Sequence, residues 1–402
     1  MMNNELRAGK PGMKHHIIKI GSDKEIVCCD NAQLRFVGLE DYGFYDMILP
    51  FSMAVLDDGS ILLLAAAQRN WQEGRPDAPK IQAFWTKSKD SGKTFSPLKE
   101  IPGAHCRPSG LVNLGNGELY FRCIQKENES FVCRNYFSED YGETWHSRFV
   151  ETPPDPTGRL AWTEGDPWVD RDTQTGKVVT WETLYDTSGG WPKKPTVSFI
   201  RRSVDKGLTF QYFIQPENWR KEEELDGMRY TRAVGEASLI RAANNHLVAA
   251  LRTDIPVRFF KSLHDDSLCG LAVAISEDEG HSWSVPKVLY EAGRHHPSLV
   301  RLQDGRIVMS YVLRDEMEDG VLASYRRGCE AVISYDNGHT WDMERKYILD
   351  EFQYLQDDSY WVNGNCGHCC SVLAPDGMIL TAYGNYNNRG CTLIKWYPQE
   401  EK

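Results

Sequence analysis

One short pattern, Ser-x-Asp-x-Gly-x-Thr/Ser followed by Trp or Phe, occurs five times and constrains the fold more than any other feature. Its copies are "SKDSGKTF" from Ser88, "SEDYGETW" from Ser138, "SVDKGLTF" from Ser203, "SEDEGHSW" from Ser276 and "SYDNGHTW" from Ser334. The aspartate can accept hydrogen bonds from backbone amides of its own turn, the glycine can adopt a positive φ, and the aromatic ring can pack beneath the loop. Repeated copies of one loop indicate a repeat architecture, in which we expect these aspartates to be structural.

A second repeat lies between the first, and consists of two apolar strands joined by a short turn. Its six copies are "MAVLDDGSILLLAAA", "GLVNLGNGELYFRC", "PWVDRDTQTGKVVTWE", "SLIRAANNHLVAAL", "SLVRLQDGRIVMSYV" and "SVLAPDGMILTAYG". Each alternating pair is typical of a β-hairpin with a Gly or Asn turn. Six such inner hairpins, together with outer hairpins that carry the first pattern, predict an all-β fold, a six-bladed β-propeller.

The sixth unit has no loop pattern of its own and ends soon after "CTLIKWYP". We expect the N-terminal segment "HHIIKIGSDKEIVCC" to supply the outer strand of the last blade and so close the ring, which removes exposed sheet edges. No Pro-rich or Gly/Ser-rich linker divides the chain. Residues 1–402 are therefore expected to form a single domain, with 1–13 as a flexible N-terminal segment.

Composition and charge exclude several classes of partner. The net charge of −11 argues against nucleic acid, and the longest aliphatic run, "ILLLAAA", is too short to cross a bilayer. The N-terminus has no apolar core of signal-peptide length, so we expect a cytoplasmic protein whose eleven cysteines are reduced. Nothing in the sequence predicts a cofactor or an oligomeric state.

The stretch "CGHCCSVLAPDG" at 366–377 combines three cysteines with a histidine, which suggests a metal site at first. Zinc sites with this spacing usually take a second cysteine pair from elsewhere, and the chain has no second pair with the same spacing. Alternation along a strand also sends Cys369 and Cys370 to opposite faces. We therefore expect no metal there, with Cys370 in the core and His368 at the start of an innermost strand.

In a propeller, the starts of the innermost strands and the ends of the second strands face one central mouth. The candidate residues at these positions are Ile48, Leu49, His105, Arg107, Glu164, Asp166, Glu236, His295, His296, His368, Cys369, Arg69, Arg122, Glu182, Arg252 and Arg314. So much charge and imidazole predicts a binding or catalytic mouth. His295 and His296 are adjacent on a strand, so their side chains are expected to point in opposite directions.

The repeat loops, in this architecture, resemble those of the Asp-box (BNR-repeat) proteins of the sialidase superfamily, over essentially the whole chain. "GEASLI" and "ALRTD" resemble the blade-four signature, which implies that Glu236 is the carboxylate beside the nucleophile and Arg252 one of three arginines for a substrate carboxylate. In "YRRGCEAVISYDNGHTW", Arg326 fits the third arginine, with Arg327 as the close alternative. Arg69 in "AAAQR" resembles the arginine that ends the second strand of blade one.

The chain departs from the superfamily pattern at two positions. Ile48 stands where the resemblance implies the first arginine, and His368 stands where it implies the nucleophilic tyrosine. Because Asp77 follows Arg69 in the loop that carries the family's acid/base aspartate, it is the first candidate for that role. Asp166, at a strand start, is the second.

These features predict a sialidase-like exo-glycoside hydrolase that acts on an acidic sugar or glycan terminus. Glu236 with a histidine or aspartate partner would perform the chemistry, while Arg252 and Arg326 would bind the anionic group. A histidine-dependent lyase on uronic acids, with a neutral imidazole as base, is one alternative; a non-catalytic glycan-binding propeller is the other. The remaining substrate-binding candidates are Arg69, Arg107, His295, His296, Tyr360 and Trp361, the last two as an aromatic wall or as packing between blades.

Overall fold

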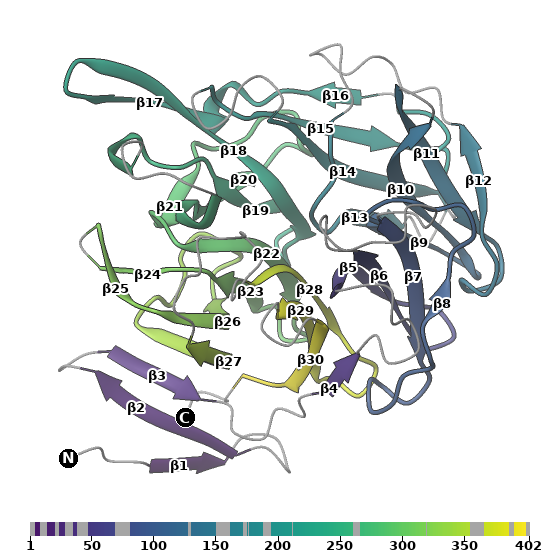
Figure 1. Cartoon of the computed structure of the whole chain (residues 1–402), viewed down its shortest axis with the longest axis horizontal. Coiled ribbons are helices and arrows are strands. Elements are labelled where there is room, and N and C mark those ends of the chain that lie inside the picture. The colour runs from purple at the N-terminus through teal and green to yellow at the C-terminus, as the bar shows by residue number, and fades with distance from the viewer. Residues whose placement is uncertain are drawn as a thin grey trace.

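The computed structural model describes residues 5–8, 14–20, 24–28, 35–37, 47–68, 81–127, 130–149, 161–171, 175, 177–187, 194–210, 212–259, 266–318, 320–353, 366–385 and 390–398. Within these ranges the chain is almost entirely β-structure, with six antiparallel blades around a central axis (Figure 1). This is the six-bladed β-propeller that the repeats predict. No described helix is long and apolar enough to cross a membrane.

Each blade runs outward from its innermost strand. Blade one contains β5 (Met47–Val55), β6 (Ile61–Gln68), β7 (Ile81–Ser88) and β8 (Lys99–Glu100). Blade two contains β9 (Ser109–Gly115), β10 (Glu118–Glu127), β11 (Ser130–Ser138) and β12 (His146–Phe149). Blade three contains β13 (Trp168–Arg171), β14 (Val178–Asp186), β15 (Val197–Ser203) and β16 (Tyr212–Ile214).

Blades four to six follow the same order. Blade four contains β18 (Met228–Arg241), β19 (Leu247–Thr253), β20 (Gly270–Ser276) and β21 (Lys287–Tyr290). Blade five contains β22 (Arg294–Arg301), β23 (Ile307–Leu313), β26 (Arg326–Ser334) and β27 (Arg345–Gln353). Blade six contains β28 (Cys366–Leu373), β29 (Ile379–Asn385), β30 (Gly390–Trp396) and β4 (Arg35–Val37). Smaller elements are β17 (Arg220–Leu225), which pairs with the first half of β18, the β24 (Glu316–Glu318) and β25 (Val321–Ser324) pair, and 3-10 turns at Glu217–Trp219, Val257–Phe259 and Asp266–Leu268.

The core of the protein lies in the seams between neighbouring blades, each of which is filled by an apolar cluster. Between blades six and one, Cys370 and Leu393 pack with Ile61 and Leu63. Cys369, which precedes Cys370, lies on the opposite face of β28 and packs against the cluster between blades five and six. The prediction that Cys370 is a core residue is confirmed.

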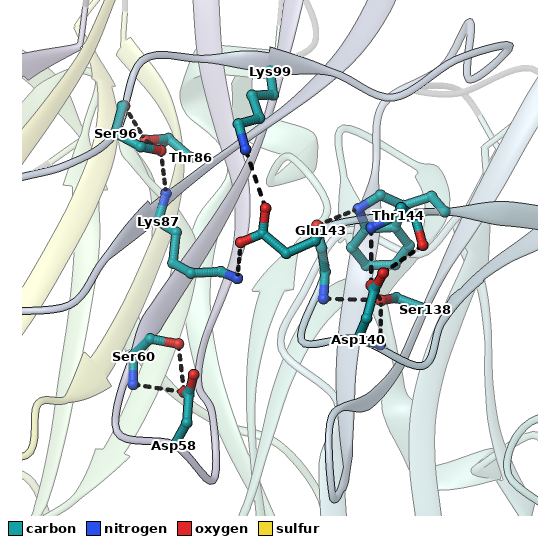
Figure 2. A network of polar contacts seen from close by, with 12 residues as sticks. Asp58, Ser60, Thr86, Lys87, Ser96, Lys99, Ser138, Asp140, Glu143 and Thr144 are labelled. Atoms are coloured by element: carbon teal, nitrogen blue, oxygen red, sulfur yellow. Dashed lines mark hydrogen bonds and ion pairs between the residues drawn. The ribbon is translucent and has the colours of Figure 1, made fainter.

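The five repeat loops share one set of hydrogen bonds, shown for the second loop in Figure 2. Ser138 Oγ donates to Asp140 Oδ1 at 2.9 Å and accepts from Gly142 N at 2.8 Å, while Asp140 Oδ1 accepts from Thr144 N at 2.9 Å. The same bonds recur in the other four copies. Glu143 ties this loop to blade one through Lys87 at 2.8 Å. The aspartates are structural, as predicted.

The N-terminal strands differ from the prediction. β1 (Glu5–Ala8), β2 (Lys14–Ile20) and β3 (Lys24–Cys28) extend the outer edge of blade five, where β3 pairs in parallel with β27 (Figure 1). The ring is closed instead by β4, in the last blade as expected, through pairs such as Cys391↔Val37. The alternating pattern of residues 14–28 is compatible with the outer edge of any blade, so it did not indicate blade five. The closing strand β4 has only three residues, which are too few to show a periodic pattern. β1 also lies within the segment 1–13 that we expected to be flexible.

One pair of cysteines departs from the expectation of reduced thiols. Cys106 and Cys123 form a disulfide with a Cα–Cα distance of 5.7 Å. The bond joins Cys106, in the segment before β9, to Cys123 in β10, and so closes a loop within blade two. Arg107 is the first residue of this loop after Cys106.

Candidate active site

The innermost strands share an irregularity near the central opening. In β18, Gly235 pairs with Arg252 and Ala237 with Leu251, so that Glu236 is an extra residue. The same bulge occurs at His368 in β28, and β22 gains one residue between His295 and Ser298. β5 and β9 also gain one residue each. A bulge re-aims the side chain that it carries, which is why such features are common beside active sites.

Three of these bulge residues have a strained backbone. The φ angles of Glu236, His296 and His368 are 43°, 47° and 51°. Non-glycine residues adopt this region at a cost of about 1–3 kcal/mol each, and the cost is most often tolerated at functional sites. The strain falls in three successive blades, on a carboxylate and two imidazoles that are all buried. We name Glu164, Tyr185, Glu236, His296 and His368 the mouth cluster.

Glu236 and His296 form the centre of the mouth cluster. Glu236 Oε1 lies 2.8 Å from Arg252 Nη1, and Glu236 Oε2 lies 3.5 Å from His296 Nδ1. The other ring nitrogen of His296, Nε2, lies 3.3 Å from Arg314 Nη2. Arginine can only donate, so Nε2 accepts and Nδ1 carries the proton toward Glu236. Burial, then the charges of His368 and Arg314, hold the pKa of His296 well below its usual range, so the imidazole is neutral.

Glu164, which precedes β13, lies on the blade-three side of the same group. Its Oε1 is 3.3 Å from Arg107 Nη1, and carboxylate and ring atoms of Glu164, His296 and His368 all lie within 4.8 Å of one another. Burial raises the pKa of Glu164, but His368, Arg107 and a hydrogen bond from Tyr185 lower it by more, so it stays below the usual value. Glu164 is therefore ionised at neutral pH.

Tyr185, the penultimate residue of β14, was not predicted from the sequence. Its ring packs on Gly235, where any Cβ would lie 3.2 Å from the Tyr185 Cβ, and the Arg252 guanidinium lies 5.6 Å from its ring centroid. Burial, with Glu164 and Glu236 nearby, raises the pKa of Tyr185 well above its usual value. The hydroxyl is therefore protonated and donates to Glu164. Its position in the strand could have indicated Tyr185, because Arg252, which was predicted, is likewise the penultimate residue of the second strand of its blade.

Two other second-strand residues of the predicted ring do not join the cluster. Sequence reasoning placed Glu182 of blade three at the mouth. Instead, Glu182 accepts from Arg201 Nε at 2.8 Å and from Tyr120 Oη at 2.6 Å, in a buried network of blades two and three. Arg122 donates to Ala161 O at 3.1 Å.

His295 corrects the expectation that the two adjacent histidines point apart. Atoms of Glu236, His295 and His296 that could bind a ligand all lie within 4.8 Å of one another, and the two rings are 5.8 Å apart. The prediction was wrong because it assumed a regular strand. The bulge in β22 cancels the alternation at this point.

Asp166, the second candidate for the acid, links blades. Its Oδ2 accepts hydrogen bonds from Ser238 Oγ at 3.0 Å and Ser298 Oγ at 2.5 Å. These hydroxyls in turn accept from Leu299 N and Ser371 N, so one carboxylate connects the inner strands of blades three to six. Burial raises the pKa of Asp166 to about 6. The arrangement gives Asp166 a structural role.

Arg326 lies in a different charge network from the mouth cluster. It binds Glu316 through Nε at 2.7 Å and Glu330 through Nη2 at 2.5 Å. Arg327, the alternative, pairs with Asp315 at 3.3 Å. The arginines that contact the mouth cluster are Arg107, Arg252 and Arg314, from blades two, four and five. The remaining candidates, Arg69, Asp77, Tyr360 and Trp361, lie outside the described residues.

The donor set of the mouth cluster suits an anion better than a metal ion. Glu164, His296 and His368 have the spacing of metal ligands. However, both ring nitrogens of His296 already face partners, and one of these is the Arg314 guanidinium. Like charges about 4 Å apart repel by roughly 4 kcal/mol near a protein surface. The cysteine pattern predicted no metal at 366–370, and the arginines give a physical reason to expect none beside His368.

Solved structures with the same fold include several glycan-active proteins. The phage phi92 endosialidase superposes with a TM-score of 0.61 at 11% identity, covering 96% of this chain and 72% of that one. The intramolecular trans-sialidase from Ruminococcus gnavus, solved with oseltamivir carboxylate, gives 0.57 at 12% identity, covering 96% and 100%. The GH93 α-L-arabinofuranosidase of Fusarium graminearum, solved with arabinobiose, gives 0.50 at 13%, covering 90% and 96%.

No family model and no curated protein matches the sequence. At 11–13% identity, the structural matches establish the fold alone. The chain therefore has the six-bladed propeller fold seen in sialidases and in an arabinofuranosidase.

Proposed function

We propose that this protein is a carbohydrate-active enzyme that cleaves the glycosidic bond of an anionic sugar, with the mouth cluster as its active site. The observation that carries the proposal is the convergence of two carboxylates and two imidazoles from four blades, three of them buried on strained bulges. A fold that needs only alternating apolar residues has no structural use for this arrangement. Strain and buried charge are tolerated where chemistry requires them.

The charge balance of the mouth cluster supports an anionic substrate. Among the described residues, Arg107, Arg252 and Arg314 present three guanidinium groups to two carboxylates, Glu164 and Glu236, which leaves an excess of positive charge around a neutral His296. A substrate carboxylate would neutralise this excess through charge-assisted hydrogen bonds. The Arg107 side chain is 30% exposed, more than its partners, and is placed to meet a ligand from solvent.

For hydrolysis, we assign the chemistry to Glu236 and His368. Glu236, oriented by Arg252 and His296, acts as nucleophile or as the base that activates water. His368, beside the Glu164 carboxylate, exchanges a proton with the leaving oxygen, as carboxylate-oriented imidazoles do in many enzymes. The Phe51 ring, 4.2 Å from the His368 ring, offers an apolar face to a sugar.

Elimination from a uronic acid is the second candidate, and His296 is the observation that favours it. The imidazole is held in its neutral form, and its unprotonated nitrogen Nε2, which faces Arg314, would take the proton on the carbon next to the uronate carboxylate once Arg314 turns to bind that carboxylate. Arginine neutralises that carboxylate, and the glycosidic oxygen leaves as the carbon–carbon double bond forms. Hydrolysis and elimination therefore differ in their products, saturated in one case and unsaturated in the other.

The test is a panel of sialosides, glucuronides, polyuronides and unsaturated uronides, assayed for reducing ends and for ultraviolet absorbance of a new double bond. Glu236→Gln and Arg252→Ala are expected to abolish turnover of the accepted substrate. Glu139→Gln, which changes an exposed carboxylate on the second repeat loop, serves as the matched control. Binding without turnover on any substrate would refute an enzyme and leave a glycan-binding propeller; neither binding nor turnover would refute both.

A further inference from the structure

A second group of potential metal ligands lies at the opposite end of β18 from Glu236. It consists of His246 in the turn between β18 and β19, Glu277 in the fourth repeat loop, and His339 in the fifth. We name these three residues the junction site, because they join blade four to blade five. Their ligand atoms all lie within 4.8 Å of one another; His246 Nδ1 is 4.0 Å from Glu277 Oε1, and the two imidazole rings are 6.2 Å apart.

The fold does not require these side chains. The five repeat loops can be compared as internal controls: Glu277 follows the serine of its loop, where the others have Lys89, Glu139, Val204 and Tyr335. His339 follows the glycine, where the others have Lys93, Glu143, Leu208 and His281. The shared loop bonds use the serine, aspartate, glycine and Thr/Ser only. The side chains of Glu277 and His339 are therefore available for another purpose.

The backbones that carry the three ligands are held together across the seam. Asn244 N donates to Asn337 Oδ1 at 3.3 Å, which joins the blade-four turn to the blade-five loop two residues from each histidine. Gly338 packs so closely on Val248 that a Cβ would lie 2.9 Å from a Val248 methyl group. To close the site, the exposed side chains of Glu277 and His339 must rotate, and the partly buried His246 must exchange the contact of Nδ1 with Asn244 Nδ2, at 3.1 Å, for the ion. Little ordering of the backbone therefore opposes binding.

The charges at the junction site favour a cation, in contrast to the mouth cluster. Glu277 contributes a carboxylate, and the nearby Arg241 is already bound to Asp170 at 2.7 Å and to Glu279 at 2.9 Å. The whole chain carries a net charge of −11. Two imidazoles and one carboxylate are the donor set that borderline first-row ions such as Zn²⁺ prefer over Ca²⁺ or Mg²⁺.

We propose that His246, Glu277 and His339 bind one divalent transition-metal ion of the zinc type, with water completing the tetrahedron, and that this ion clamps blade four to blade five. The proposal is independent of the chemistry assigned to the mouth cluster. It gives the propeller a metal-dependent contact on the side away from the substrate.

The experiment uses the full chain after removal of metal by a chelator, titrated calorimetrically with ZnCl₂. One saturable site is expected, and free Zn²⁺ at about 100 times Kd should raise the unfolding midpoint by about 3 °C for a chain of this size. His246→Ala and His339→Ala should each weaken binding by at least about tenfold and remove the thermal shift. His281→Ala changes the equivalent histidine of the fourth loop and should leave both unchanged.

Titration with Co²⁺ provides a second readout, because a tetrahedral site with imidazole ligands gives intense visible absorption. Absence of saturable binding would overturn the proposal, as would unchanged affinity in both His246→Ala and His339→Ala. Loss of binding in His296→Asn but not in His339→Ala would place the ion in the mouth and would refute the junction site. His281→Ala and His339→Ala alter exposed side chains, whereas His246→Ala alters a partly buried one, so the unfolding midpoint of each metal-free variant is measured beside that of the parent.

Discussion

The mouth cluster and the ion pairs around Glu330 both bury carboxylates beside arginines, yet they are built differently. Glu330 lies on β26 without a positive φ, beside an extra residue of the neighbouring strand β27, and is within 2.5 Å of Arg326, 3.5 Å of Arg294 and 3.6 Å of Lys346. Glu236 lies on a bulge with a positive φ and shares its surroundings with neutral imidazole. The first arrangement surrounds one carboxylate with three cationic groups and places no strain on its own backbone, whereas the second places the carboxylate on a strained backbone.

We expect this difference to separate residues that stabilise the ring from the residues proposed for chemistry. Removing a fully paired buried carboxylate leaves its cationic partners uncompensated, which is costly. Replacing Glu236 by Gln keeps the side-chain shape and leaves one cationic partner, Arg252, without its carboxylate, where Glu330 has three such partners. Substitutions in the two clusters should therefore divide cleanly between activity and stability.

The largest effect is expected for Glu236→Gln. If Glu236 is the nucleophile or base, kcat/KM should fall by about 10³-fold, because the amide can neither attack nor accept a proton. The unfolding midpoint should stay within about 2 °C of the parent. Steady-state kinetics on the substrate identified by the panel, together with thermal unfolding, measure both. A large loss of stability with normal turnover would reverse the proposed division.

Glu330→Gln should give the opposite result. The change leaves Arg326, Arg294 and Lys346 without their shared carboxylate, and a cost of about 3–5 kcal/mol in the free energy of unfolding is expected. Turnover per folded molecule should be unchanged, because none of these groups contacts the mouth cluster. Denaturant unfolding measures the change in the free energy of unfolding, and active-site titration with steady-state kinetics measures the turnover per folded molecule. Stability equal to that of the parent would show that the network is dispensable.

Acid should reveal the same network. Burial raises the pKa of Glu330, but Lys346, Arg294 and Arg326 lower it further, to about 2. Because the folded pKa lies below the unfolded value, this stabilisation is complete above about pH 4.5 and is lost as the pH falls toward 2, by an amount on the order of 3 kcal/mol. Glu316, Tyr290 and Tyr311 face the same group, and neither tyrosine titrates in this range.

The measurement is the free energy of unfolding of the parent and of Glu330→Gln between pH 6 and the acid transition. The variant should show a flatter dependence on pH, since its amide does not titrate. Parallel curves for the two proteins would contradict the assignment of the acid transition to Glu330.

The smallest effect is expected for Tyr185→Phe. The Tyr185 hydroxyl donates to Glu164 and helps to keep the pKa of that carboxylate low. Without the donor the pKa of Glu164 rises, so the acid limb of the pH–activity profile should move to higher pH. The free energy of unfolding should change by only about 1 kcal/mol. An unshifted acid limb would exclude Tyr185 as the group that positions Glu164.

Sequence reasoning recovered the propeller because its signals are local. Each hairpin and each repeat loop fits within about twenty residues, and its pattern does not depend on the rest of the chain. The closing strand was different: Arg35–Val37 pairs with Cys391–Leu393, more than 350 positions away, and three residues carry no period. The predicted mouth residues Glu236 and His368 both lie beside His296, because the starts of the innermost strands face the centre of a propeller.

Within the mouth, the errors came from assuming regular strands. The bulge in β22 brings His295 and His296 to the same carboxylate, which alternation forbids. Arg326 was preferred by its spacing, but the structure commits it to Glu316 and Glu330, while Arg314 contacts His296. Tyr185 was missed because its importance lies in contacts with Glu164 and Gly235, which belong to other strands.

The bulges also bear on how this protein could be engineered. The extra residue of each bulge is not paired with the neighbouring strand, and regular pairing resumes on both sides of it. A different side chain at the bulge therefore leaves the apolar residues of the strand facing the same seams. Positions 236, 296 and 368 can then be randomised together in a library without repacking the seams, whereas a change at position 51 also alters packing against Met47, Leu49 and Ala66. Glycine or asparagine at 236, 296 and 368 would even relieve the backbone. Such a scaffold allows new substrate specificities to be selected from libraries that vary only these positions.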